Sequence, residues 1–187
     1  MEIILKKQTF VILLLGIFIS LNGVAHAQDE ARPDDVTTIE GIMKAYYEVV
    51  SGPAGVEREW ARDRSLHHPE AQVVIVRDGE NGVAEANVMT LSEFHGPPGP
   101  AQNAFYEFEV YREVRRHGAN VHVWSTYEWR SEDNGPAQGR GVNSIQMFFD
   151  GTRYWITEWM FDGRSSAPAV EEAYLPESRW GDRLQGQ

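Results

Sequence analysis

The chain has 187 residues, no cysteine and a formal net charge of −11. The length fits one domain, and the lack of cysteine excludes a disulfide framework and thiol chemistry. The acidic balance argues against nucleic acid or an anionic membrane surface as a partner, because both require basic patches.

Residues 1–27 have the pattern of a secretory signal. Lys6 and Lys7 precede an apolar run at 10–21, and residues 25–27 form an A-x-A cleavage site. The apolar run is shorter than the roughly 20 residues that span a bilayer, which favours cleavage over an uncleaved anchor. We therefore expect an exported protein, periplasmic or secreted, with no membrane attachment after cleavage. Its charge would be −12, because the segment holds 2 of the 17 basic and 1 of the 28 acidic residues.

Two helices are predicted after a polar linker at 28–35. Residues 35–51 repeat apolar side chains at steps of three and four, with Asp34 or Asp35 as a cap and a Gly-Pro pair at 52–53 as the end. Residues 56–66 predict a shorter, more charged helix with Trp60 as its apolar anchor. His67, His68 and Glu70 follow. Adjacent histidines on a helix point about 100° apart and rarely share a metal, so no metal site is predicted.

Strands dominate the rest of the chain. Residues 71–76 and 83–89 flank a turn-rich stretch and predict a hairpin, and Thr90 with Glu93 has the spacing of a helix capping box. A long strand is predicted at 104–116, followed by a three-strand antiparallel meander at 120–161. The segment 163–187 is rich in Ser, Pro, Glu and Arg and is expected to be a loosely ordered tail. The fold class is therefore α+β.

The turns of the meander predict its register. Asp150-Gly151 is typical of a two-residue hairpin turn, because such a turn requires positive φ at both positions. With that turn, Asn143 pairs with Glu158. A symmetric loop between the first two strands pairs Tyr127 with Asn143. Tyr127, Asn143 and Glu158 would then form one cross-strand row.

The two faces of the meander differ in polarity. The face with the Tyr127 row is the more apolar and is assigned to the core, together with Tyr106, Phe108, Val110 and Arg112 of the preceding strand. The other face has aromatic residues that suggest a covering second subunit: Trp124, Phe148, Trp155 and Trp159. A polar rim of that contact is expected to contain Glu107, Glu109, His122, Glu128 and Arg153.

The order of these elements and several phrases resemble a known family. The phrases are SGPAG, R-x-W followed by RSLHHPEA, HVWSTYEWR and RGVNSIQMFFDGTRYWI. They resemble the nuclear transport factor 2-like superfamily, specifically its SnoaL-like branch of small exported bacterial proteins, over residues 36–162. The resemblance implies a cone-shaped, curved antiparallel sheet wrapped around two to three N-terminal helices, and a homodimer through the outer sheet face. The superfamily includes isomerases, dehydratases, cyclases and non-enzymatic ligand binders, so it does not fix an activity.

The predicted cavity suggests three functions. The first is binding of a small apolar or mixed-polarity ligand, without a cofactor, in a pocket lined by Tyr46, Trp60, Val110, Arg112, Tyr127, Asn143 and Glu158. The second is a cofactor-free lyase or isomerase, in which desolvation makes Glu158 a base and Tyr127 is a donor. The third is a non-catalytic structural or interaction module whose cone is filled by core side chains. An open pocket in which Glu158 pairs only with Arg112 would favour binding. The steroid-isomerase set, an Asp base with a Tyr and a protonated Asp, is not matched by any motif here.

Overall fold

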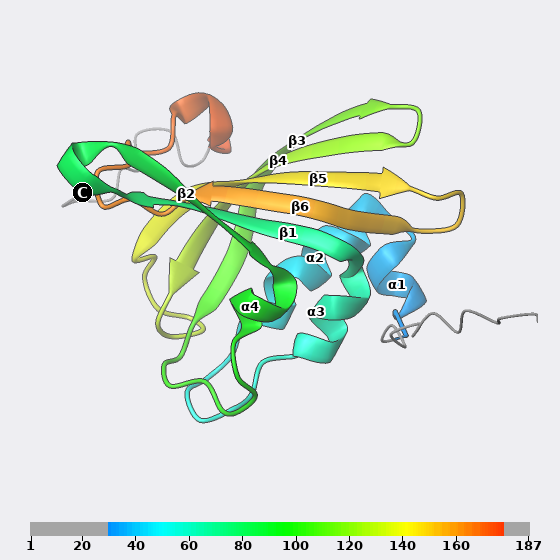
Figure 1. Ribbon diagram of the computed structural model, residues 1–187, viewed down its shortest axis with the longest axis horizontal. Coiled ribbons are helices and arrows are strands. Elements are labelled where there is room, and N and C mark those ends of the chain that lie inside the picture. Colours follow the sequence, from blue (N-terminus) through cyan, green and yellow to red (C-terminus); the bar gives the residue numbers. More distant parts are fainter. Residues whose placement is uncertain (1–29, 178–187) are drawn as a thin grey trace, which may run out of the picture.

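Helices precede a sheet along most of the chain (Figure 1). The computed structural model describes residues 30–177; the predicted signal at 1–27, the start of the linker and residues 178–187 of the tail lie outside the described residues. The α-helices are α1 (Pro33–Val36), α2 (Ile39–Val50), α3 (Trp60–Leu66) and α4 (Leu91–His95). The strands are β1 (His67–Asp78), β2 (Ala84–Thr90), β3 (Tyr106–His117), β4 (Asn120–Arg130), β5 (Gly139–Phe149) and β6 (Tyr154–Asp162). Two 3₁₀ turns are η1 (Glu80–Gly82) and η2 (Glu172–Tyr174).

The strands form one mixed sheet in the order β2-β1-β6-β5-β4-β3. Strands β3 to β6 form an antiparallel meander, and β1 and β2 form an antiparallel hairpin. The two parts join through β1 and β6, which pair in parallel. Helices α1, α2 and α3 lie on one side of the sheet (Figure 1). The α+β class is confirmed. The sheet is mixed rather than wholly antiparallel and is not strongly curled, so the expected deep cone is not observed.

Helix α2 supplies the helical half of the core. Its Ile42, Met43, Tyr46 and Tyr47 are buried, as the three-and-four spacing predicts. Val49, which lies outside that repeat, is also fully buried, whereas Val50 is only partly buried. The helix begins later than expected because Thr38 is its N-cap and accepts a hydrogen bond from the Gly41 amide at 2.9 Å. The capping box predicted at Thr90 is present at the start of α4. Among the described residues, no helix is long and apolar enough to cross a membrane.

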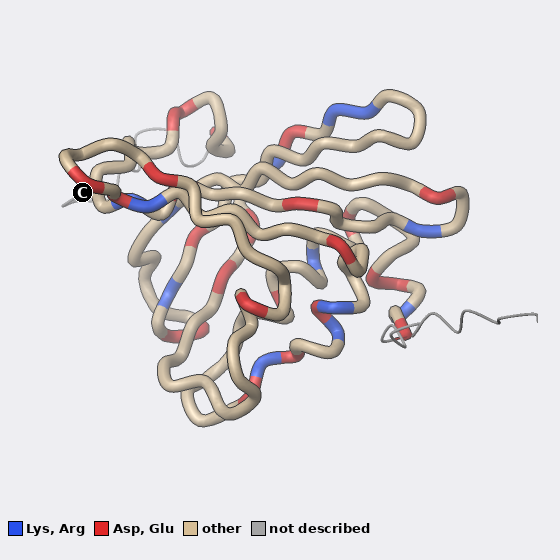
Figure 2. Tube along the Cα trace, viewed as in Figure 1, with Lys and Arg blue, Asp and Glu red and all other residues tan. Residues whose placement is uncertain are grey.

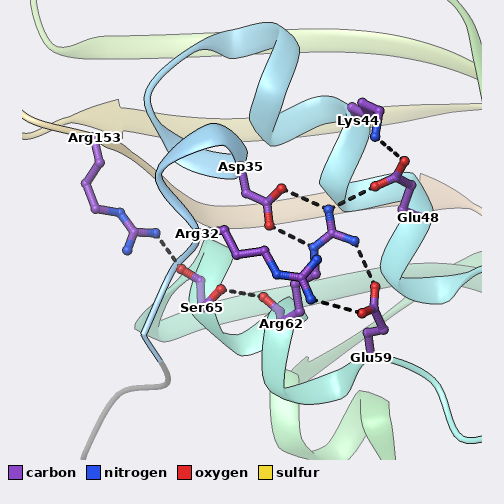
Figure 3. Close-up of polar contacts among 8 residues, drawn as sticks. All are labelled: Arg32, Asp35, Lys44, Glu48, Glu59, Arg62, Ser65 and Arg153. Carbon is purple, nitrogen blue, oxygen red and sulfur yellow. Dashed lines mark hydrogen bonds and ion pairs between the residues drawn. The ribbon is translucent and has the colours of Figure 1, made fainter.

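Arg62 of α3 joins the three N-terminal helices (Figure 3). Its guanidinium donates to both carboxylate oxygens of Asp35 at 2.7 and 2.8 Å, to Glu48 at 2.9 Å and to Glu59 at 2.8 Å. The side chains of Arg62 and Asp35 are only 11% and 10% exposed. The hydrogen bond from Arg62 lowers the pKa of Asp35, so this carboxylate stays charged where the helices meet.

The loop between β5 and β6 is longer than predicted, and β6 contains a bulge. Phe149 pairs with Tyr154, and the loop is closed by a hydrogen bond from the Asp150 amide to the Arg153 carbonyl. Thr157 is the extra residue of the bulge, because Met147 pairs with Ile156 while Gln146 pairs with Glu158. The bulge reverses the direction of every later side chain.

Strand β3 has a second bulge, at Val110. Glu109 pairs with Tyr127, but Tyr111 pairs with Thr126, which leaves Val110 without a cross-strand partner. Glu107 and Glu109 therefore share the face of Tyr127, which is the helix side. The prediction that both glutamates lie on the outer face is wrong.

The described part of the tail packs on the outer face of the sheet, away from α2 and α3 (Figure 1). Thr126 donates a hydrogen bond to the Tyr174 carbonyl at 2.7 Å, and the rings of Trp124 and Tyr174 lie 5.7 Å apart. Leu175 is 7% exposed. Part of the aromatic outer face is thus covered by the same chain.

Candidate functional site

A cavity of about 280 Å³ lies between the helices and the inner face of the sheet. Seven aromatic rings dominate its wall, and among residues 30–177 the only carboxyl side chains on it are those of Asp63 and Glu107. Neither lysine nor arginine of the described part of the chain belongs to the lining. The lining residues are Tyr46, Val50, Asp63, Phe94, Phe105, Glu107, Tyr127, Trp129, Asn143, Trp159 and Phe161.

Glu107 places a carboxyl group on this aromatic wall. Its side chain keeps intermediate accessibility because it faces the cavity, although protein surrounds it. Among residues 30–177 its carboxyl forms no hydrogen bond or ion pair, and burial alone raises its pKa to about 8. The charged form is poorly solvated and has no charged partner within the described residues, so the raised pKa favours the neutral acid at pH 7. A neutral carboxyl can donate one hydrogen bond and accept another.

Two tyrosines line the cavity near Glu107. Burial raises the pKa of Tyr46 and of Tyr127, with Glu107 a further cause for each. Tyr127 lies across Gly141 of β5, where an added Cβ atom would be 2.3 Å from the phenol oxygen. Gly139 gives Trp129 the same close approach, with an added Cβ 2.2 Å from its indole nitrogen. The two glycines therefore let large rings form one wall of the cavity.

Asp63 forms part of another wall and is backed by two histidines. Its Oδ2 lies 2.7 Å from His95 Nε2, and its Oδ1 lies 3.4 Å from His67 Nδ1. Asp63 is 2% exposed. The ring of Trp60 stacks on His95 with a centroid distance of 4.4 Å. Helices α3 and α4 thus hold an aspartate with a fixed orientation at the cavity.

A chain of hydrogen bonds leads away from the cavity through the sheet side of α2. The amide of Asn143 donates to Tyr47 at 3.3 Å, and the Tyr47 and Ser125 hydroxyls are 2.7 Å apart. Ser125 donates to Glu109 at 2.5 Å, and Arg112 donates to the other Glu109 oxygen. The hydrogen bond from its amide nitrogen to Tyr47 fixes the orientation of the Asn143 side chain.

Glu109 and Arg112, at the end of this series of hydrogen bonds, line a second hollow, a groove of about 450 Å³ between α2 and β3. Glu107 lines both hollows. The groove is lined by Met43, Lys44, Tyr47, Glu48, Ser51, Tyr106, Glu107, Phe108, Glu109, Arg112 and Asp133.

The structure brings together three of the predicted pocket residues: Tyr46, Tyr127 and Asn143. The predicted cross-strand row is wrong, because Asn143 pairs with Ser125 and Phe161. Glu158 pairs with Gln146 on the outer face and does not line the cavity.

The other predicted pocket residues are displaced for identifiable reasons. Val110 lies in the β3 bulge, and Arg112 faces the groove paired with Glu109. Trp60 stacks on the ring of His95 and does not line the cavity. Sequence reasoning missed Asp63 and Glu107. The alternation of side chains along β3 places Glu107 on the face opposite Tyr127. Only with the bulge at Val110 taken into account do Glu107 and Tyr127 share a face.

No group of three or more histidine, aspartate or glutamate side chains suited to a metal ion occurs within residues 30–177. His67 is fully buried and contacts Asp63, while His68 lies near Phe148 and Trp155 on the outer face. The adjacent histidines thus point to different sides of β1.

Compared with known proteins, the chain matches no family model, and a search of curated proteins finds no match.

Proposed function

We propose that the protein binds a small, largely apolar molecule in the cavity between the helices and the sheet. The observation that carries the proposal is a cavity of about 280 Å³ with seven aromatic rings and an unpartnered carboxyl, Glu107. Cavities with apolar walls and a few convergent polar groups are the usual sites of small ligands. The order of helices and strands also supports membership of the nuclear transport factor 2-like superfamily, in its SnoaL-like branch.

A further donor supports a ligand rather than an empty cavity. Trp159 lines the cavity and is 5% exposed, yet its indole N–H has no hydrogen-bond partner within the described residues. Buried donors are rarely left without an acceptor. The ligand would therefore have at least one acceptor atom as well as an apolar body.

Native mass spectrometry of the protein purified from its own host tests this proposal. We expect a co-purifying compound of fixed stoichiometry that is lost on denaturation. Val50→Phe should fill the cavity and abolish the extra mass, whereas Val114→Phe, on an exposed position of β3, should retain it. Equal retention in both variants, or no compound together with no hit in a ligand-observed NMR screen of small molecules, would contradict binding in the cavity.

Catalysis is the second candidate, as a cofactor-free lyase or isomerase. Asp63 and Glu107 line the same cavity in different environments, one hydrogen-bonded to an imidazole and one without a partner. Two carboxyl groups in unlike environments can divide the roles of base and acid. Asp63 would accept a proton from the substrate, and Glu107 would return one. Solvent-deuterium incorporation into the ligand, lost in Asp63→Asn, is the expected result.

Export and dimerisation are also proposed. The residues at 1–27 support export, which N-terminal sequencing of the protein from its host would test. Phe148 and Trp155 support a homodimer through the part of the outer face beyond the tail; both are half-buried. Light scattering should give twice the chain mass, and Phe148→Asp should give the single-chain mass.

A further inference from the structure

The composition of the cavity wall points to the charge of its ligand. Two carboxyl groups lie on the wall, and no lysine or arginine within residues 30–177 lines it. An anionic ligand would lose its water without gaining a cationic partner, which is a large cost in a desolvated site. Neutral and positively charged ligands remain.

Aromatic faces favour the positively charged class. A ring attracts a cation placed over its face within about 6 Å of the centroid, and several rings around one site add to this. Phe94 meets Trp159 edge to face at 4.8 Å, and Tyr46 meets Trp159 in the same way at 5.9 Å. These perpendicular contacts turn ring faces in different directions around the cavity.

Glu107 supplies the complementary charge. A carboxylate in a cavity with no positive partner is destabilised, and a bound cation removes that destabilisation. Asp63 is the second carboxyl group on the wall, and its imidazole partner His95 holds it in place. The net charge of −11 adds a favourable long-range potential for a cation, and Figure 2 shows acidic positions spread over the described part of the chain.

From the aromatic walls, the two carboxyl groups and the lack of a cationic lining residue among the described residues, we infer that the ligand is an organic cation, an amine or quaternary ammonium compound whose apolar body also has an acceptor atom for the indole N–H of Trp159. The inference rests on the proposed function, since it names the class of molecule that the cavity binds. The ammonium group would lie between Glu107 and the rings, and the apolar body would fill the rest of the cavity.

Ionisation of Glu107 must accompany the binding of a cation. The titratable and charged groups around Glu107 come from both hollows that it lines. On the cavity side they are Tyr46 of α2, Asp63 of α3, His95 of α4 and Tyr127 of β4. On the groove side they are Lys44, Tyr47 and Glu48 of α2, Tyr106, Glu109 and Arg112 of β3, and Asp133, with Lys44 paired to Glu48 and Arg112 to Glu109. With the pKa of Glu107 at about 8 in the free protein, a cation that requires the carboxylate should bind about tenfold more tightly at pH 7 than at pH 6 and release nearly one proton at pH 7.

The test uses phenyltrimethylammonium and its neutral isostere tert-butylbenzene in titration calorimetry with the full chain. At pH 8 we expect phenyltrimethylammonium to bind at least tenfold more tightly than tert-butylbenzene. The binding enthalpy of the cation should depend on the ionisation enthalpy of the buffer, which reports proton release. Glu107→Gln should remove both the preference for the cation over tert-butylbenzene and the proton release. The affinity for tert-butylbenzene should remain unchanged. Glu158→Gln, the same change on the outer face of the sheet, should alter neither.

The outcomes separate the two proposals. Equal or tighter binding of tert-butylbenzene, or pH-independent binding of the cation, would overturn the cationic ligand and leave cavity binding in place. Binding of neither probe, together with no co-purifying compound, would overturn both. If Glu107→Gln does not fold, the pH dependence of the unmodified protein still decides between them.

Discussion

At the scale of single residues, the clearest consequence concerns Glu107. Its pKa of about 8 in the folded protein exceeds the ordinary value of 4.5. Between these two pH values the folded state keeps a proton that the unfolded state has released. Stability therefore falls as pH rises from 4.5 to 8, and then no longer changes through this group.

Glu107→Gln should remove that loss of stability. We expect the variant to match the unmodified protein near pH 4.5 and to exceed it by about 1–3 kcal/mol at pH 8, less than the full pKa difference implies because the side chain faces a cavity. Urea denaturation at several pH values measures the difference. A variant less stable than the unmodified protein at pH 8 would show that the carboxyl supports the fold.

The contrast between Glu107 and Glu158 shows the limit of sequence reasoning for single residues. Both glutamates lie in aromatic strands, and strict alternation puts Glu158 inside and Glu107 outside. One bulge in each strand reverses both assignments. The sequence prediction placed Glu158 beside Tyr127, whereas the carboxyl that lines the cavity with Tyr127 is Glu107. The difference depends on two bulges that no residue pattern indicates.

At the scale of elements, the bulge in β6 predicts an exchange of core residues. Trp159 is 5% exposed and Met160 is 38% exposed, the reverse of regular alternation. We expect Trp159→Ala to cost about 3–5 kcal/mol and Met160→Ala less than about 1 kcal/mol, measured by chemical denaturation. A larger cost for Met160→Ala would mean that β6 lacks the bulge.

The helical layer predicts a second effect, at Arg62. Arg62→Ala would leave Asp35 buried without its bidentate partner, at a cost of about 3 kcal/mol. Arg115→Ala, the same change at a highly exposed position of β3, is the matched control. Because the pKa of Asp35 is lowered in the folded state, its contribution exists above its ordinary pKa and is lost in acid. Thermal denaturation should therefore show the two variants converging as the pH falls well below 4.

Most elements could be predicted because local signals determine them. The spacing in α2, the capping box at Thr90 and the apolar runs of the meander are contained in short segments. The start of α2 was misplaced because Thr38 competes with the nearby aspartates as a cap. The parallel pairing of β1 with β6 was not predicted, because it joins segments distant in sequence.

At the scale of the whole molecule, the described part of the tail acts as a cover for the sheet. Thr126 is fully buried and donates to the Tyr174 carbonyl. Thr126→Val keeps the shape but removes the donor, at a cost of about 1 kcal/mol. Limited proteolysis should then cut residues 163–177 about fivefold faster while the sheet remains intact. An unchanged cutting rate would show that other contacts hold the segment.

The position of β1 between β2 and β6 has a consequence for how the chain folds. Strand β1 can form its hairpin with β2 early, but its other edge gains a partner only after β6 is complete. The paired positions lie 86 to 89 residues apart, for example Gln72 and Glu158 or His67 and Ile156, and closing so long a loop slows folding. During synthesis the sheet therefore cannot be completed until nearly all of the described chain has left the ribosome. If the protein is exported as proposed, this late completion of the sheet would keep the chain unfolded for longer. An unfolded chain is the form that can be moved across a membrane.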